Sequence, residues 1–275
     1  MKKQQIASNA VVMLLRILVA LIMIFPFIWM VLGSLKMKSE LFAVPLKWFP
    51  ETPIWSNYAD VFETIPFLTF YFNTAKVAIL STLGQVISCA LSAYAFAKLE
   101  FRGRDTLFLL YLATLMIPGQ VTMIPQYELL NQIGLLNNLW ALILLRWFSP
   151  FGVFLLRQFF ISIPDSLVEA ARIDSAGEIT IFVRIMCPLA KPAFATLITL
   201  TFLNSWNEFM GPLIFLNEKS KFTLQIGIRY FQQMFGTEYT LIMAATTMSL
   251  IPILLIYIFA QKYFIEGIAS AGIKG

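Results

Sequence analysis

The run VVMLLRILVALIMIFPFIWMVL, residues Val11–Leu32, decides the fold class of this chain. It holds one charged residue, Arg16, and as an α-helix it extends about 33 Å at a rise of about 1.5 Å per residue. A membrane's hydrocarbon layer is about 30 Å thick, and a segment that crosses it must satisfy its own backbone hydrogen bonds. The run is too long for the apolar part of a signal peptide, so it predicts a retained first membrane span.

Further apolar runs follow, separated by polar turns. With Val11–Leu32 they give six expected spans, the others being Phe70–Phe96, Leu107–Pro125, Leu139–Phe160, Pro192–Leu216 and Leu241–Phe264. The composition agrees, because 59% of the residues are hydrophobic and only 13% are charged, whereas soluble domains are about one quarter charged. Pro118-Gly119 predicts an early end of the regular helix in the third run. We therefore expect an all-α membrane protein with six transmembrane helices in one domain, residues 1–275.

Basic residues predict how the chain is oriented. The turn 98–105 holds Lys98, Arg102 and Arg104, whereas the loop 120–138 holds no basic residue. Cytoplasmic loops are enriched in Lys and Arg, so the first turn is expected inside and the second outside. An even number of spans then places both the N- and the C-terminus in the cytoplasm. The formal charge of +5 fits loops beside an anionic lipid surface, and without a continuous basic stripe we expect no nucleic-acid partner.

The sequence lacks the groups that catalysis needs. It contains no histidine, and its two cysteines, Cys89 and Cys187, lie in unrelated segments. Neither a metal-ligand cluster nor a nucleophile beside a base is visible. The phosphate-binding pattern Gly-x-x-x-x-Gly-Lys-Ser/Thr is also missing. We expect no catalytic residue, metal or cofactor in this chain, and any ATPase must be a separate chain.

The longest polar interruption on the predicted cytoplasmic side is residues 161–191, which read IPDSLVEAARIDSAGE from Ile163 to Glu178. Ser166 followed by Glu169 fits a capping box, which predicts a short helix over residues 166–173. Residues 174–177, Asp-Ser-Ala-Gly, favour a break, so a second helix is expected to begin near Glu178.

The spacing in this loop resembles the permease subunits of binding-protein-dependent ABC importers. Their signature is Glu-Ala-Ala, three residues, Gly, nine residues, Ile, one residue and Leu-Pro. The matching residues are Glu169, Ala170, Ala171, Ile185 and Pro188, whereas Ser175 replaces the Gly and Cys187 the Leu. Gly177, two residues after Ser175, is a possible substitute turn point. Three other stretches are similar to the carbohydrate branch of that family: Ser149–Phe160, Ser205–Leu213 and Gln261–Gly275.

The resemblance implies the type I ABC importer permease fold, with a family core over residues 70–264, a coupling loop at 161–191 and a tail at 265–275. It assigns coupling to the ATPase to Glu169, Ala170, Ala171, Asp174, Ser175 and Gly177. The implied partners are a second homologous permease, two ATPase subunits that carry ATP and Mg, an extracellular substrate-binding protein and membrane lipid. The implied cargo is a sugar or oligosaccharide, and the implied location is a bacterial or archaeal cytoplasmic membrane. The alternative from the residues alone is that Glu169 only caps its own helix, and the two roles are compatible.

Polar residues inside spans are candidate contacts for the cargo, because a lipid-exposed charge is costly. Arg146 lies within the fourth run, where it is expected to contact substrate or a neighbouring subunit. Asn204, Trp206, Asn207 and Glu208 lie near the outer end of the fifth run, where their oxygens and indole suit sugar hydroxyls and a sugar face. The alternative is an interfacial Trp that marks the end of the span.

An ion-coupled secondary transporter or channel is the alternative function. Such proteins often carry ionisable residues within their spans. Every Asp and Glu of this chain maps to a loop or to the end of an expected span. This pattern favours the ATP-driven importer.

Overall fold

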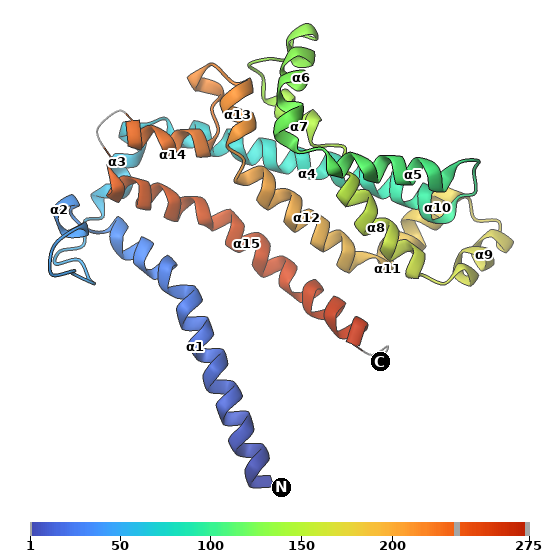
Figure 1. The fold of residues 1–275 in the computed structure, drawn as a ribbon, viewed down its shortest axis with the longest axis horizontal. Helices are drawn as coiled ribbons and strands as arrows, with labels where there is room; N and C mark the ends of the chain where they lie inside the picture. Colours follow the sequence, from blue (N-terminus) through green and yellow to red (C-terminus); the bar gives the residue numbers. More distant parts are fainter. Residues whose placement is uncertain (1, 234–236, 273–275) are drawn as a thin grey trace. The chain divides into compact units, whose positions relative to one another are not determined.

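The computed structural model describes the backbone of residues 2–233 and 237–272, and the side chains of residues 11–232 and 237–263. Within these ranges all regular structure is helical, which confirms the all-α fold class (Figure 1). The chain forms two compact units. Unit 1 comprises residues 1–67 and 227–251, and unit 2 comprises residues 68–226 and 252–275.

Unit 1 contains α1 (Lys2–Ser34), α2 (Lys38–Leu41), α3 (Ser56–Thr64) and the adjoining parts of α14 (Leu224–Gln233) and α15 (Tyr239–Gly272). Residues 11–28 of α1 are exposed along their whole length. An apolar helix that its own chain leaves uncovered needs hydrocarbon or another apolar surface around it. Near its end α1 packs closely, because a Cβ added at Gly33 would lie 2.3 Å from Met243 Sδ.

Unit 2 begins with the long helix α4 (Phe67–Lys98). The elements that follow are α5 (Arg104–Ala113), the 3-10 turn η1 (Thr114–Met116), α6 (Gly119–Gln132), α7 (Leu139–Leu145), α8 (Pro150–Ser162), α9 (Asp165–Ile173), α10 (Glu178–Ile181), the π-helix η2 (Phe182–Met186), α11 (Cys187–Leu189), α12 (Lys191–Trp206), α13 (Met210–Phe215) and the 3-10 turn η3 (Lys219–Lys221). In Figure 1, α6, α7 and α13 lie together on one side of α4, and α9 and α10 lie at its C-terminal end.

Two apolar clusters among the described residues of unit 2 lie at these two places. The first joins α4, α5, α8 and the segment from α9 to α12, with Tyr94, Phe160 and Ile181 among its buried residues. The second joins α4, α6, α7 and α13, with Leu130, Ile143 and Phe215 among its buried residues. Because each cluster is continuous, the elements that form the two candidate sites are held by packing.

Three helical segments are long and apolar enough to cross a membrane alone: Val11–Ser34, Phe67–Lys98 and Tyr239–Tyr263. Three further pairs of helices are long and apolar enough when the two bent members of each pair are taken as one segment. The described residues therefore allow up to six spans. This number agrees with the six expected spans, but the third bent pair, Glu178–Leu189 with Lys191–Trp206, begins before the expected fifth span at Pro192 and bends by 80°.

Three of the expected spans are not continuous helices. The third bends by 100° between α5–η1 and α6, as Pro118-Gly119 predicted. The fourth is broken between α7 and α8, whose axes differ by 40°. Proline lacks the N–H that continues a helix, which explains both breaks, since Pro118 and Pro150 follow them. The predicted end of the fifth span at Leu216 is wrong, because α12 stops at Trp206 and α13 begins only at Met210.

Candidate functional site

The predicted loop helix is confirmed as α9, Asp165–Ile173. Its predicted capping box is wrong, because the residue at the cap is Pro164 and no side chain bonds the free backbone N–H groups there. Lys98 of α4 bonds two acceptors beside this end of the helix. Lys98 Nζ donates to the carbonyl oxygen of Ile163 at 2.8 Å and to Asp165 Oδ1 at 2.5 Å. The loop is thus tied to the end of a long helix that lies far away in sequence.

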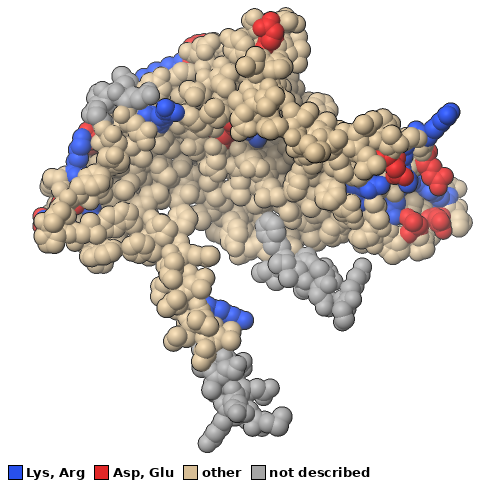
Figure 2. Space-filling view, in the orientation of Figure 1, with Lys and Arg blue, Asp and Glu red and all other residues tan. Residues whose placement is uncertain are grey.

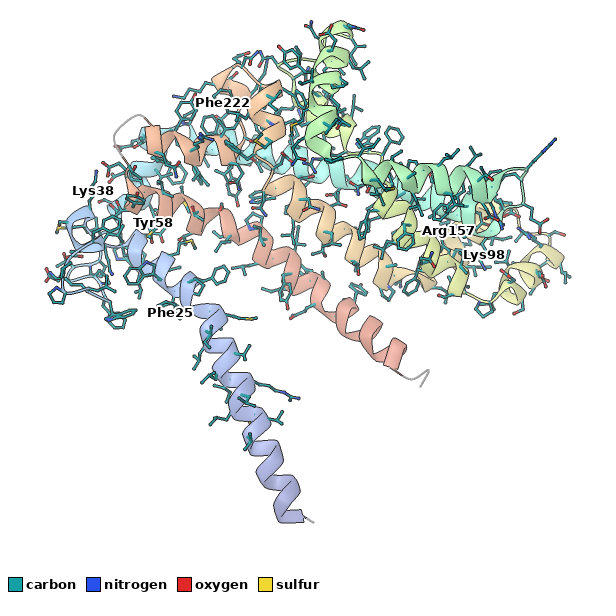
Figure 3. All side chains as sticks on the ribbon, in the orientation of Figure 1. Phe25, Lys38, Tyr58, Lys98, Arg157 and Phe222 are labelled. Atoms are coloured by element: carbon teal, nitrogen blue, oxygen red, sulfur yellow. The ribbon has the colours of Figure 1, made fainter. Side chains whose placement is uncertain are left out.

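The Lys98–Asp165 pair joins a buried cation to an exposed anion. The Lys98 side chain is only 4% exposed, whereas that of Asp165 is 77% exposed. The hydrogen bond from Lys98 lowers the pKa of the Asp165 carboxyl. Arg157 of α8 lies at the same end of unit 2 (Figure 3), where its Nε donates to the carbonyl oxygen of Phe96 at 3.1 Å. Two cations therefore fix the last turn of α4 beside the loop.

The turn after α9 is a Schellman motif. Ser175 N donates to the carbonyl oxygen of Arg172 at 3.0 Å, and Ala176 N donates to that of Ala171 at 2.9 Å. Ser175 has φ +62°, the left-handed conformation that glycine usually takes. Gly177 has φ −71° and is extended, so the interpretation of Gly177 as a substitute turn point is wrong. Ser175 keeps the glycine geometry at its own position.

The second predicted helix is confirmed as α10, which begins at Glu178. Glu178 joins three elements. Its Oε1 accepts from Arg172 Nε of α9 at 2.8 Å, and its Oε2 accepts from the Tyr94 hydroxyl of α4 at 2.5 Å. The two short helices and the long helix are therefore linked through one carboxylate.

The inner face of the loop is apolar and the outer face is presented to solvent. Val168, Ile181 and Met186 are buried, and Ala171 packs half-buried against the same cluster. The other predicted coupling residues are exposed, namely Glu169, Ala170, Asp174, Ser175 and Gly177. Figure 2 shows Lys, Arg, Asp and Glu side chains gathering at this end of unit 2.

Sequence reasoning missed two apolar residues on the outer face. Ile173 and Ile179 flank the turn and are 83% and 81% exposed. Large apolar side chains on both sides of a polar turn were the available signal, since neither is needed to form the turn. They add an apolar component to a surface that otherwise carries small and charged side chains.

Arg146 lies in the break after α7, where it caps the helix. Its guanidinium forms an ion pair with Glu208, which lies in the break after α12. Glu208 Oε1 also accepts from the backbone N of Gly211 at 3.0 Å. The structure thus gives Arg146 a partner within its own chain and unites two of the predicted path residues.

The remaining predicted path residues lie in different surroundings. Trp206 is only 1% exposed; its ring stacks on Phe202, with centroids 5.5 Å apart, and meets Tyr71 edge-on at 5.3 Å. It is a core residue here, and neither the predicted sugar contact nor the interfacial alternative describes it. Asn207 Nδ2 donates to the carbonyl oxygen of Leu203. Asn204 lines a cavity of about 380 Å³ together with Arg146.

A second cavity, of about 330 Å³, is lined by Arg146, Glu208 and residues from the start of α6. Trp147 fixes the break that presents Arg146. Its Nε1 donates to the carbonyl oxygen of Leu80 at 3.2 Å, and a Cβ added at Gly84 would lie 1.9 Å from that nitrogen. Only a glycine in α4 permits this approach. No group of His, Cys, Asp and Glu in the described residues is placed to hold a metal ion.

The chain is similar to proteins of known families. Residues 87–270 match a family described as "Binding-protein-dependent transport system inner membrane component". The chain is 35% identical over 261 residues to the arabinooligosaccharides transport system permease protein AraQ of Bacillus subtilis, covering 94% of this chain and 93% of that protein. It is 34% identical over 254 residues to the sulfoquinovosyl glycerol transport system permease protein SmoH of Agrobacterium fabrum, covering 92% and 89%.

The fold also has a solved counterpart. A chain in the crystal structure of a bacterial ABC transporter involved in the import of the acidic polysaccharide alginate superposes with a TM-score of 0.81. That chain is 26% identical, and the match covers 96% of this chain and 98% of the other. The likeness therefore extends over nearly the whole of both chains.

Proposed function

The chain belongs to the family of inner membrane components of binding-protein-dependent transport systems, and from this premise we propose that, with a second homologous permease, it forms the path by which an ATP-driven importer carries a carbohydrate. It is a membrane subunit of an ABC importer and is not itself an enzyme. We treat residues 1–275 as one permease domain, placed in a bacterial or archaeal cytoplasmic membrane with both termini inside.

The observation that carries the coupling role is the Schellman turn at Ser175. It sets α9 and α10 at a fixed angle, on an apolar base and with the outer face free. Glu169 and Asp174 offer acceptors to basic groups of an ATPase, and Ile173 and Ile179 offer apolar contacts. We assign this face to docking of the ATPase, with Ala170, Ser175 and Gly177 allowing a close approach.

The energy source lies on other subunits. In the proposed assembly two ATPase subunits bind ATP and Mg, and an extracellular protein delivers the cargo. When an ATPase moves, α9 moves with it, and the links through Lys98 and Glu178 carry that displacement to α4. The loop thus transmits the movement of the ATPase to the long helix α4.

The carbohydrate cargo is supported by the names of the relatives and by the cavities. AraQ is named for arabinooligosaccharides and SmoH for sulfoquinovosyl glycerol. Arg146, Asn204 and Glu208 line cavities with amide and hydroxyl neighbours that suit sugar hydroxyls. We therefore assign these three residues to the sugar path, and we exclude the buried Trp206 ring from direct contact.

Substituting Glu169→Ala together with Asp174→Ala tests the docking role. The assembled transporter is placed in proteoliposomes, and uptake of an oligosaccharide is measured beside ATP hydrolysis. Uptake should fall about tenfold, the effect of losing about 1.4 kcal/mol of docking energy, while hydrolysis by the ATPases persists. Ser166→Ala is the matched control, because Ser166 is exposed on the same helix and makes no capping bond.

Normal uptake by the double variant at wild-type amounts of protein would contradict the docking role. Uptake that requires a proton gradient and no ATP would contradict the importer itself and favour a secondary transporter. The two outcomes are separate, since the first leaves ATP dependence intact.

A further inference from the structure

Three helix interruptions of unit 2 meet at one cavity. Its lining comes from the start of α6, the end of α7 and the start of α13, and its volume is about 330 Å³. Non-helical backbone at membrane depth is tolerated where it lines a cavity, and broken helices hold the cargo in many transporters. The interruptions therefore expose polar groups at a place where cargo can pass.

The charged side chains that line this cavity carry no net charge. Arg146 and Glu208 are its only charged lining residues among those the structure describes, and they form an ion pair with each other. The other polar side chains of the lining are uncharged: Gln120, Thr122 and Gln126. The cavity of about 380 Å³ shares Arg146, and its other polar lining residues are also uncharged: Gln85, Ser149, Thr201 and Asn204.

Glu208 is held in position to neutralise Arg146. One carboxylate oxygen accepts from Arg146 and the other from the backbone N of Gly211. The Arg146 and Glu208 side chains are 25% and 26% exposed, so both remain accessible. A guanidinium has five N–H donors, and the ion pair uses one of them in the described structure. The remaining donors can bond hydroxyl groups without breaking the pair.

We propose that the Arg146–Glu208 pair is a charge filter that makes this path selective for uncharged carbohydrates. An anionic glycan that approaches Arg146 also meets Glu208, so it gains no net attraction and must displace a carboxylate that two donors hold. An uncharged glycan leaves the pair intact and bonds the free guanidinium N–H groups. The filter acts on the sugar path proposed above and thus rests on that function.

Charged thiol reagents measure the filter without any cargo. In the assembled transporter with Gln120→Cys and Cys187→Ala, the labelling rate of residue 120 is compared for an anionic and a cationic methanethiosulfonate of similar size. Glu208→Gln removes the charge and keeps one acceptor oxygen, which can serve either Arg146 or Gly211. The anionic-to-cationic rate ratio should therefore rise about fivefold. Arg146→Gln should lower it by a similar factor. The exchanged double variant Arg146→Glu/Glu208→Arg should stay within about twofold of the parent.

Uptake measures whether the filter selects cargo. Proteoliposomes with ATP and a constant binding protein are given arabinotriose or its aldonate, in which the reducing-end sugar is an open chain that carries one carboxylate. The open chain is the same for every variant, so its effect cancels in the comparison. Because the binding protein is the same throughout, its own preference cancels when variants are compared. Glu208→Gln should raise the aldonate-to-neutral uptake ratio about fivefold, and the exchanged double variant should not.

A labelling ratio that neither Glu208→Gln nor Arg146→Gln changes would overturn the filter, even if uptake of arabinotriose is normal. If Glu208→Gln does not assemble, the Arg146→Gln ratio decides alone. Altered labelling ratios with an unchanged uptake ratio would overturn the selectivity. If the parent transports no carbohydrate, the proposed function fails, whereas the labelling ratios still report the charge of the cavity.

Discussion

Two Arg–Glu pairs bridge helix interruptions in unit 2, and they differ in sequence separation and in surroundings. Arg172 and Glu178 are six residues apart, join α9 to α10 at 2.8 Å and are each 44% exposed. Arg146 and Glu208 are 62 residues apart, join the breaks after α7 and α12 and are about one quarter exposed. The Arg172–Glu178 pair lies at a solvent-exposed turn. The Arg146–Glu208 pair lies where the chain is expected to cross a membrane.

The difference shows which interactions hold each site. An exposed pair contributes little, typically less than about 1 kcal/mol, so the loop keeps its shape through the Schellman hydrogen bonds and its buried apolar base. A charge within an expected span that loses its partner is costly, because its surroundings solvate it less well than bulk water does. The cavity therefore depends on its pair, and the loop does not.

Removing one member of the cavity pair should have the largest effect. Glu208→Ala leaves Arg146 without its carboxylate and should lower the free energy of unfolding by about 2 kcal/mol. The measurement is thermal unfolding of the purified transporter in detergent. Glu178→Ala, the matched change in the loop, should cost less than about 1 kcal/mol.

The double variant Arg146→Met/Glu208→Ala separates charge from shape. It should recover most of the stability that Glu208→Ala loses, because no unpaired cation remains. A double variant as unstable as the single one would mean that packing, and not charge, holds the two breaks together.

The turn itself gives an effect of intermediate size. Ser175→Gly should raise the free energy of unfolding by about 1 kcal/mol, because glycine takes a positive φ without the steric cost of a Cβ. Gly177→Ala, at a φ of −71°, should be neutral or slightly stabilising. Thermal unfolding of both variants checks the assignment. A large loss of stability with Gly177→Ala would indicate that Gly177, and not Ser175, is the residue that the turn requires.

The smallest effect is expected from pH. The hydrogen bond from Lys98 lowers the pKa of Asp165, whose ordinary value is 3.8. A lowered folded-state pKa gives stability that is present above the ordinary value and is lost as pH falls through the folded value. Wild type should therefore be slightly more stable than Asp165→Asn at pH 7, and the difference should shrink as the pH falls below 3.8. A difference that grows on acidification would contradict the pair.

The coupling loop was largely predictable because its signals are local. The end of α9, the break after it and the start of α10 follow from residues within a few positions of each other, and the structure confirms them. The capping box failed because α9 begins at Asp165 after Pro164, which places Ser166 inside the helix and not at its cap. The prediction of Gly177 as the turn point failed because Ser175 itself takes the left-handed conformation. A sequence gives only a preference for that conformation at each residue.

The candidate path was predictable only in part. Proline marked the break before α6, but nothing local marked the end of α12 at Trp206. Glu208 bonds Gly211 and a guanidinium 62 residues away, and these contacts accompany the break. Trp206 illustrates the same limit, since a span-end Trp can face the membrane interface or the core, and its neighbours Phe202 and Tyr71 decide for the core.

The sequence by itself determined that the chain lies in a membrane, that its elements are helices and how the residues of the coupling loop are spaced. These follow from adjacent residues, because apolar run lengths and short-range turn preferences are local properties. Only the tertiary structure decided that Arg146 and Glu208 meet, that Lys98 holds the loop and that three breaks line one cavity. Such contacts join segments whose separation along the chain carries no signal, and they form only when the long helices pack together.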